Sequence, residues 1–288
     1  MKIRRGSNME NIKDYVCRIK ELYKTNYAEE LALINFVIVQ VGNVEASNRY
    51  VRNKIKDCNE LGIKAEVKRF DETITEDELL NELGNLNCNP LVTCYMVQFP
   101  LPKHINQKHI EAAIAPEKDA DGFTGVYTNP CTPMGIIKYL ERQDYPFEGK
   151  NAVIFGRSDI VGKPMAKLLL EKDCNITVLH SKTSRTDKKE YLRTADLVIA
   201  ATGHANLITI DDLNYYYHGD ITLFDVGINF NEEGKMVGDC QKDLPVKWQS
   251  PVPGGVGLLT RLQLLENIYY LYSIFHSKGK HVGMAKGL

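Results

Sequence analysis

Short runs of apolar residues alternate with amphipathic segments along most of the chain, and this alternation restricts the fold more than any other feature. Several of the runs are apolar at every position, which is typical of strands covered by helices on both faces. Repetition of strand and helix with short connections predicts a doubly wound α/β fold built on parallel sheets. The predicted strands are 34–41, 64–70, 91–98, 151–155, 176–180, 197–201 and 221–226, and the predicted helices are 48–61, 76–83, 162–171 and 188–192.

The length of 288 residues is enough for two domains. A Pro- and Gly-rich region at 121–150 predicts the seam between them, and a second break falls at 250–257. We therefore expect an N-terminal α/β domain over 1–120 and a Rossmann-like domain with a doubly wound parallel sheet over 121–257. A helical pattern with one apolar face follows, and it predicts a terminal helix, about 258–288, that packs back on the first domain.

Charge, cysteine content and hydropathy exclude several classes of protein. The 36 Lys and Arg nearly balance the 37 Asp and Glu, whereas dedicated nucleic-acid binders usually have a basic excess. The longest apolar stretch, 31–41, is too short to span a bilayer, and the first residues lack the apolar run of a secretion signal. Seven scattered cysteines without a C-x-x-C pair, and no His or carboxylate cluster with ligand spacing, argue against disulfides and metal sites. We expect a cytoplasmic protein without a metal, nucleic-acid or membrane partner.

A glycine turn follows the predicted strand 151–155 and leads into a predicted helix. Gly156 permits a tight turn there, and Gly162 lets the helix begin close to the sheet with its free N–H groups available to a phosphate. The spacing G-x5-G departs from the usual dinucleotide fingerprint G-x-G-x-x-G. An ordinary strand-to-helix turn therefore stays an alternative at this point.

The end of the next predicted strand, 176–180, indicates which dinucleotide would bind. Folds that prefer NAD usually place a carboxylate there to bind the ribose 2′-hydroxyl. This chain has Ser181 and Lys182 instead, and both, together with Arg157, would attract a 2′-phosphate. The pattern favours NADP over NAD, although Arg157 could equally be a solvated turn residue.

Tyr50 and Lys54 lie four residues apart on a predicted helix and so share one face. Ser47 is expected to cap this helix, and Gly62 is expected to end it. Lys54 lies at the border of the apolar face, where partial burial would favour the uncharged amine and allow proton exchange near neutral pH. The pair alone is also compatible with an ordinary helix surface.

Two further segments place polar groups where a ligand would bind. Gln98 ends an otherwise apolar strand, and Asp119 and Asp121 come just before Gly122. Ligands of open α/β sheets bind at the carboxyl ends of the strands. A glutamine there can hold an amine or a water, and an aspartate can accept two hydrogen bonds from an aminopyrimidine edge.

Together these segments resemble the family of methylenetetrahydrofolate dehydrogenase/methenyltetrahydrofolate cyclohydrolase, the bifunctional folate enzymes. The resemblance covers about residues 33–270 in order, and its most specific stretches are 156–165 and 251–257. The other matching stretches are 41–47, 50–54, 97–102, 115–122, 130–135, 180–183, 201–203, 225–229 and 237–239.

The resemblance implies a bifunctional enzyme of one-carbon metabolism. It would oxidise 5,10-methylenetetrahydrofolate to 5,10-methenyltetrahydrofolate with NADP and hydrolyse that product to 10-formyltetrahydrofolate. Residues 1–120 would form the folate-binding catalytic domain, and 121–257 would form the NADP-binding domain. The resemblance also implies a homodimer whose other partners are tetrahydrofolate derivatives.

Residue roles follow from the same resemblance. Lys54 would be the proton carrier of the hydrolysis, with Gln98 orienting it. Tyr50 would position the substrate, and Asp121 would anchor its pterin ring. The remaining implied contacts are Gly156, Arg157, Ser158, Ser181, Thr202, Gly203 and Ile228 for the cofactor, and Pro253, Gly254 and Gly255 beside the substrate.

Several positions depart from the family pattern. The segment 124–129 is shorter than usual, which could alter the hold on the cofactor or the balance of the two activities. Leu258 replaces a common proline, Arg261 adds a charge at a usually apolar position, and Thr260 could either cap the terminal helix or touch a ligand. Two alternatives stay open: an enzyme with only one of the two activities, and a non-catalytic protein that binds nucleotide or folate.

Overall fold

Two compact units make up the part of the chain that the computed structural model describes, residues 9–213 and 220–277. One unit, called the β1–β3 unit below, contains 18–131 and 261–277. The other, called the β4–β10 unit, contains 9–17 and 132–260. The helices α1 (Ile12–Leu31), α5 (Cys131–Glu141) and α8 (Val256–Phe275) each include a boundary between the units.

These boundaries differ from the predicted ones at both ends of the first domain. Residues 121–131 group with the β1–β3 unit, because the Cys131 N–H donates to the Asp121 carbonyl at 3.2 Å. Residues 9–17 group with the β4–β10 unit, where Tyr15 packs edge-on against Tyr139 with 5.1 Å between the ring centroids.

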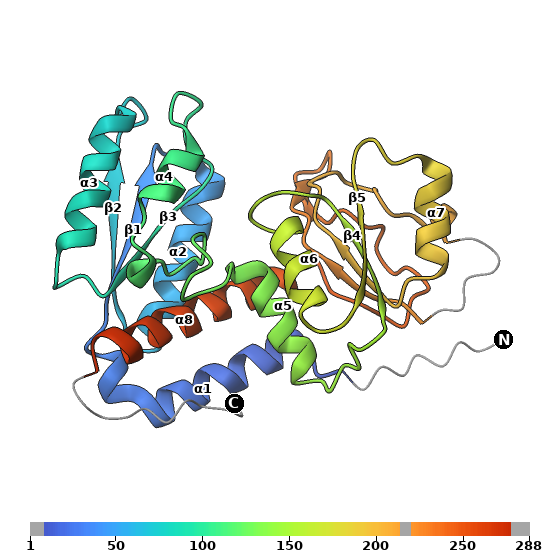
Figure 1. Cartoon of the computed structure of the whole chain (residues 1–288), viewed down its shortest axis with the longest axis horizontal. Helices are drawn as coiled ribbons and strands as arrows, with labels where there is room; N and C mark the ends of the chain where they lie inside the picture. The colour runs from blue at the N-terminus through green and yellow to red at the C-terminus, as the bar shows by residue number, and fades with distance from the viewer. Residues whose placement is uncertain (1–8, 214–219, 278–288) are drawn as a thin grey trace. The chain divides into compact units, whose positions relative to one another are not determined.

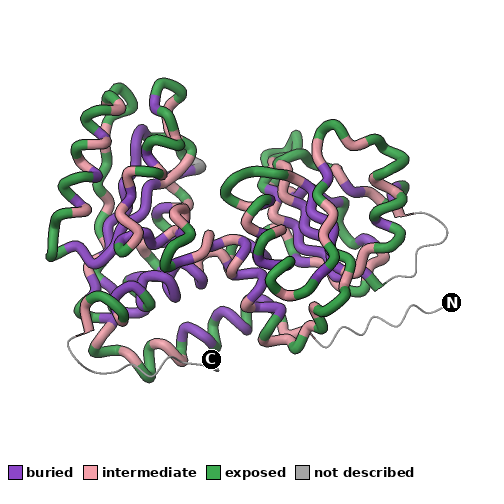
Figure 2. The backbone as a smooth tube through the Cα atoms, viewed as in Figure 1, coloured by how far each residue is buried: buried purple, intermediate pink, exposed green. Residues whose placement is uncertain are grey.

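A three-stranded parallel sheet with the order β2-β1-β3 is the centre of the β1–β3 unit (Figure 1). Alternate residues of β1 face opposite sides of it: Phe36 and Ile38 pack with α2 and α8, whereas Val37 and Val39 pack with α3 and α4. The sheet is thus covered on both faces, and β1 and β3 are buried (Figure 2). The elements are β1 (Asn35–Val41), α2 (Glu45–Glu60), β2 (Lys64–Phe70), α3 (Glu76–Cys88), β3 (Cys94–Val97), α4 (Gln107–Ala113) and the 3-10 turn η1 (Pro116–Lys118).

Five parallel strands with the order β10-β7-β6-β4-β5 form the sheet of the β4–β10 unit. Because they are parallel, the turns that follow β4, β5 and β6 meet at one edge of this sheet, where ligands of such folds bind. Its elements are β4 (Asn151–Phe155), α6 (Gly162–Leu170), β5 (Asn175–Leu179), α7 (Arg185–Arg193), β6 (Leu197–Ala200), η2 (Ile210–Asp212), β7 (Thr222–Asp225), the antiparallel pair β8 (Asn229–Phe230) and β9 (Met236–Val237), and β10 (Trp248–Gln249).

The predicted α/β class with parallel sheets is confirmed, and β2 and β4 have the predicted bounds. The region 121–150, predicted as a Pro- and Gly-rich seam, contains the helix α5. The prediction of Ser47 as a cap is wrong, because the helix already begins after Val44, whose carbonyl accepts from the Asn48 N–H. The predicted terminal helix is α8, which ends at Phe275, and residues 278–288 lie outside the described residues.

Candidate active site

The amine of Lys54 is held inside the β1–β3 unit by two acceptors, one on β3 and one on the residue that follows this strand. Only 8% of Lys54 is exposed, and its Nζ donates to Gln98 Oε1 at 3.0 Å and to Met96 Sδ at 3.3 Å. Gln98 follows the carboxyl end of β3, and its Nε2 donates to the Phe99 carbonyl at 2.7 Å, which leaves Oε1 turned to the amine. The predicted pairing of Lys54 with Gln98 is therefore present, and Met96 is an additional partner that the sequence did not indicate.

Tyr50 lies one turn before Lys54 on α2 and is half-buried. Burial raises the pKa of its hydroxyl, and the charges of Arg49 and Arg261 oppose that shift. The phenol is therefore protonated at neutral pH and can donate a hydrogen bond to a ligand or stack against it.

Asp121 is connected to the same group of residues through Cys131. Burial, together with the nearby Asp121 carboxylate, raises the pKa of the Cys131 thiol, and the Lys54 amine acts in the opposite direction. The Asp121 side chain is only partly buried, so its carboxylate can still meet a ligand. The four predicted catalytic residues thus all belong to the β1–β3 unit.

A buried group of charges fixes the helix that carries Tyr50 and Lys54. Asp57 of α2 is 5% exposed and pairs with Lys20 Nζ of α1 at 2.6 Å and with Arg261 Nε of α8 at 3.2 Å. Arg261, which departs from the family pattern, therefore has a specific partner. Separating either pair would leave a buried charge without its partner, which is unfavourable. The two ion pairs therefore stabilise the packing of α1 and α8 against α2.

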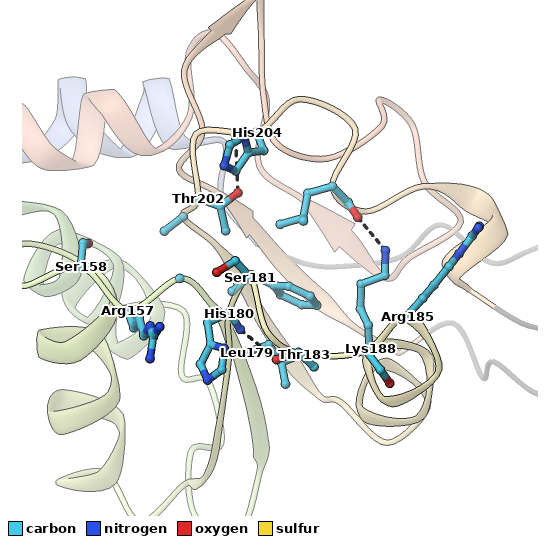
Figure 3. Close-up of a pocket in the computed structure, with 15 residues that line it drawn as sticks. Arg157, Ser158, Leu179, His180, Ser181, Thr183, Arg185, Lys188, Thr202 and His204 are labelled. Atoms are coloured by element: carbon cyan, nitrogen blue, oxygen red, sulfur yellow. Dashed lines mark hydrogen bonds between the residues drawn. The ribbon is translucent and has the colours of Figure 1, made fainter.

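A pocket of about 480 Å³ opens at the carboxyl ends of β4, β5 and β6 in the other unit (Figure 3). Five of the residues predicted to bind the cofactor line it: Gly156, Arg157, Ser158, Ser181 and Thr202. Gly156 has φ +113°, and a Cβ there would lie 2.3 Å from the Ala201 carbonyl oxygen, so the close turn requires glycine. The predicted Gly203 and Ile228 are not part of the lining.

The described lining of this pocket contains no carboxylate, and it carries several cationic side chains. Arg157 lies at one end and Arg185 with Lys188 at the other (Figure 3). Lys188 is neutralised by Asp212 at 2.7 Å, whereas Arg157 is exposed and forms no ion pair with the described residues. This charge pattern fits a phosphorylated ligand such as NADP.

Asp239 was not singled out by the sequence, although it holds the turn after β6. Its Oδ2 accepts from the Thr202 N–H at 2.6 Å, the Thr202 hydroxyl at 2.9 Å and the Gly203 N–H at 3.0 Å. A Cβ on Gly238 would lie 1.9 Å from Asp225 Oδ2, so this glycine lets the buried carboxylates approach. The stretches 225–229 and 237–239, which match the family, were the sequence signal that could have identified Asp239. The Gly203 N–H is thus used in a hydrogen bond to Asp239. Ile228 is 45% exposed.

The loop with Pro253, Gly254 and Gly255 comes directly before α8 and belongs to the β4–β10 unit. Gly254 has φ +97°, and a Cβ on Gly255 would lie 2.3 Å from the Pro251 carbonyl oxygen. Both glycines are thus required by the backbone conformation of this loop. Their contact with the substrate stays a prediction. Thr260 does not cap α8, because it lies inside the helix and donates to the Val256 carbonyl at 3.1 Å.

Among the described helices, none is long and apolar enough to cross a membrane. The described residues also contain no group of three or more His, Cys, Asp or Glu that could hold a metal ion.

Comparisons with known proteins match both units. The catalytic domain of tetrahydrofolate dehydrogenase/cyclohydrolase matches residues 9–121, and its NAD(P)-binding domain matches 130–275. The bifunctional protein FolD of Burkholderia thailandensis is 44% identical over 245 residues, 80% of this chain and 83% of that protein.

Solved structures agree with these matches. The bifunctional FolD of Campylobacter jejuni has a TM-score of 0.83 at 38% identity, covering 91% of this chain and 96% of that one. The Trypanosoma brucei dehydrogenase-cyclohydrolase, solved with NADP and an inhibitor, has a TM-score of 0.79 at 28% identity, covering 88% and 95%. The resemblance found in the sequence is confirmed, and the chain belongs to the tetrahydrofolate dehydrogenase/cyclohydrolase family.

Proposed function

We propose that this chain oxidises 5,10-methylenetetrahydrofolate with NADP and hydrolyses the resulting 5,10-methenyltetrahydrofolate to 10-formyltetrahydrofolate. The family match over 9–121 and 130–275 includes both a catalytic and an NAD(P)-binding domain. The observation that carries the proposal is the buried Lys54 amine, 3.0 Å from Gln98 Oε1. A solvated surface lysine would have no such fixed orientation.

The oxidation requires binding and orientation more than acid–base chemistry. Bound NADP would supply the hydride acceptor. Arg157 and Ser181 would bind its 2′-phosphate by charge-assisted hydrogen bonds, since the described lining of that pocket contains no carboxylate. Gly156 and the N-terminus of α6 would receive the diphosphate, and Thr202 would contact the adjoining part of the cofactor. Gly203 and Ile228 keep their assignment as cofactor contacts within this proposal.

The hydrolysis requires one group that both accepts and returns a proton. Water adds to the methenyl carbon and loses one proton. When the bond from this carbon to the pterin nitrogen breaks, that nitrogen gains a proton, and the hydroxyl of the adduct loses its proton to solvent as it becomes the formyl carbonyl. Lys54 would accept the first proton and return the second, while Gln98 keeps the amine in reach. Asp121 would accept from the aminopyrimidine edge of the pterin, and Tyr50 would position the rest of the substrate. Pro253, Gly254 and Gly255 keep their assignment as substrate contacts within this proposal.

We also propose that the protein acts as a homodimer in the cytoplasm. All seven cysteines are unpaired, which suits a reducing compartment. The dimer rests on the resemblance to the family alone. Sedimentation equilibrium would test it, because a dimer should have twice the molar mass of the chain.

An absorbance assay tests the proposed reactions. With 5,10-methylenetetrahydrofolate and NADP, the methenyl product should appear and then decay as it is hydrolysed. If the methenyl product appears and does not decay, the protein catalyses only the oxidation. If only added methenyl substrate decays, it catalyses only the hydrolysis. Binding of substrate or NADP without either reaction would refute both activities.

A further inference from the structure

A buried polar side chain of α8, Asn267, contacts both ends of the loop that carries Asp121. Asn267 is 5% exposed, and its Nδ2 lies 3.0 Å from the Ala120 carbonyl oxygen, 3.2 Å from the Asn129 carbonyl oxygen and 3.5 Å from Cys131 Sγ. Ala120 immediately precedes Asp121, and Asn129 lies where the loop returns. One amide group therefore ties together the two ends of the segment 120–131.

The orientation of this amide is fixed by a second buried amide on the same helix. Gln263, 3% exposed, donates from Nε2 to Asn267 Oδ1 at 2.8 Å. Because the oxygen of Asn267 is thus occupied as an acceptor, its two N–H hydrogens face the loop.

Contacts inside the loop complete the arrangement. The Asp119 carboxylate, on a residue 1% exposed, accepts from the Gly122 N–H at 2.9 Å and from the Thr124 N–H at 2.7 Å. Gly122 has φ +79°, and a Cβ there would lie 2.2 Å from the Asn129 carbonyl oxygen, so the chain folds back tightly at this point. The Asp119 carboxylate thus shapes the loop on either side of Asp121, while Asp121 itself stays partly exposed.

We propose that Asn267 is a positioning residue for substrate recognition: it holds the 120–131 loop so that the Asp121 carboxylate faces the aminopyrimidine edge of the pterin. This inference rests on the proposed role of Asp121. Two parallel hydrogen bonds to a planar edge require a carboxylate of fixed direction, and an error of about 1 Å in such a group is costly. Asn267 acts from the helix behind the loop without touching the substrate.

Asn267→Leu tests the inference, since leucine keeps about the same volume and removes the donors. We expect the KM for 5,10-methylenetetrahydrofolate and the Kd for tetrahydrofolate, measured by titration calorimetry, to rise about tenfold. The kcat of the oxidation and the Kd for NADP should change less than about threefold. Leu271→Ala, one turn further along α8 and fully buried, is the matched control. It should lower the melting temperature and leave both folate constants unchanged.

A double-mutant cycle with Asp121→Asn separates positioning from general destabilisation. If Asn267 acts through Asp121, the double variant should bind tetrahydrofolate hardly more weakly than Asp121→Asn alone. Multiplicative effects of the two substitutions would overturn the inference. If Asp121→Asn alone binds tetrahydrofolate normally, the proposed role of Asp121 fails instead, and the two failures are distinguishable.

Gln263→Leu keeps the inference testable if Asn267→Leu does not fold. It removes only the bond that orients the Asn267 amide, and it should raise the Kd for tetrahydrofolate about threefold. An unchanged Kd in this variant would count against the inference.

Discussion

The two predicted sites are built in opposite ways. In the β1–β3 unit, Lys54 is buried, and its amine already has two neutral acceptors, Gln98 Oε1 and Met96 Sδ. In the β4–β10 unit, Arg157 is exposed at the edge of an open pocket and forms no ion pair with the described residues. The Lys54 amine is thus oriented without a ligand, whereas the Arg157 guanidinium of the second site would gain an ionic partner only when a phosphate binds.

The difference follows from what each site has to do. A group that transfers protons must keep a fixed direction toward the reacting atoms, and buried hydrogen bonds supply that direction. A group that recognises an anion gains most from remaining unpaired until the anion replaces its water. Substitutions in the first site should therefore affect turnover, and substitutions in the second should affect cofactor affinity.

The largest effect is expected for Lys54→Met. Without a group that accepts and returns the proton, hydrolysis should fall by about 10²–10⁴-fold. In an assay started with 5,10-methylenetetrahydrofolate and NADP, the methenyl product should accumulate, and the Kd for NADP should stay unchanged. Lys56→Met, two residues along α2 and exposed, is the control and should behave as the wild type. A large loss of NADP affinity in Lys54→Met would mean that the two sites are not separate.

Arg157→Ala should have the next largest effect. Loss of charge-assisted hydrogen bonds worth about 1.5–3 kcal/mol should weaken NADP binding by about 10–100-fold. NAD lacks the 2′-phosphate, so its weaker binding should hardly change, and the NADP/NAD preference should narrow. Arg193→Ala is a matched control, because Arg193 is exposed on α7, pairs with Glu190 and does not line the pocket. An intact preference in Arg157→Ala would refute the assignment of the 2′-phosphate to this side chain.

The smallest effect is expected for Met96→Leu. The substitution conserves volume and removes one weak acceptor of the Lys54 amine, so hydrolysis should slow about two- to fivefold with little loss of stability. Met165→Leu replaces a methionine that is equally buried in α6 of the other unit, and it should change neither activity. Equal kinetics for the two variants would show that Met96 only fills space.

Much of the fold could be predicted because short strand-like runs alternate with amphipathic helical segments along the chain. This alternation gave the correct bounds for the strands 64–70 and 151–155. The helix α5 could not be predicted in the same way, since Pro133 and Gly135 give the segment the composition of a loop. Proline is tolerated in a first helical turn, and Gly135 is needed because a Cβ would lie 2.7 Å from the Leu259 carbonyl oxygen. Packing against a residue 124 positions away has no signature in a single sequence.

The candidate site was predictable to the extent that its residues lie in specific motifs. Lys54 and Gln98 were found by resemblance, and their 3.0 Å hydrogen bond agrees with the expected pairing. Met96 and Asn267 escaped notice because an apolar strand and a helix of mixed composition hide which side chain faces a site. Their roles depend on contacts between residues 42 or more than 100 positions apart.

The most direct test is the hydrolysis of preformed 5,10-methenyltetrahydrofolate, with no dinucleotide present, by the wild type, Arg157→Ala and Lys54→Met in parallel. If a buried amine in one unit carries the proton and the exposed guanidinium in the other only binds cofactor, the first two should hydrolyse it equally fast. Lys54→Met should be at least about a hundredfold slower. Hydrolysis by Lys54→Met at the same rate as by the wild type would contradict the role of Lys54 as the proton carrier.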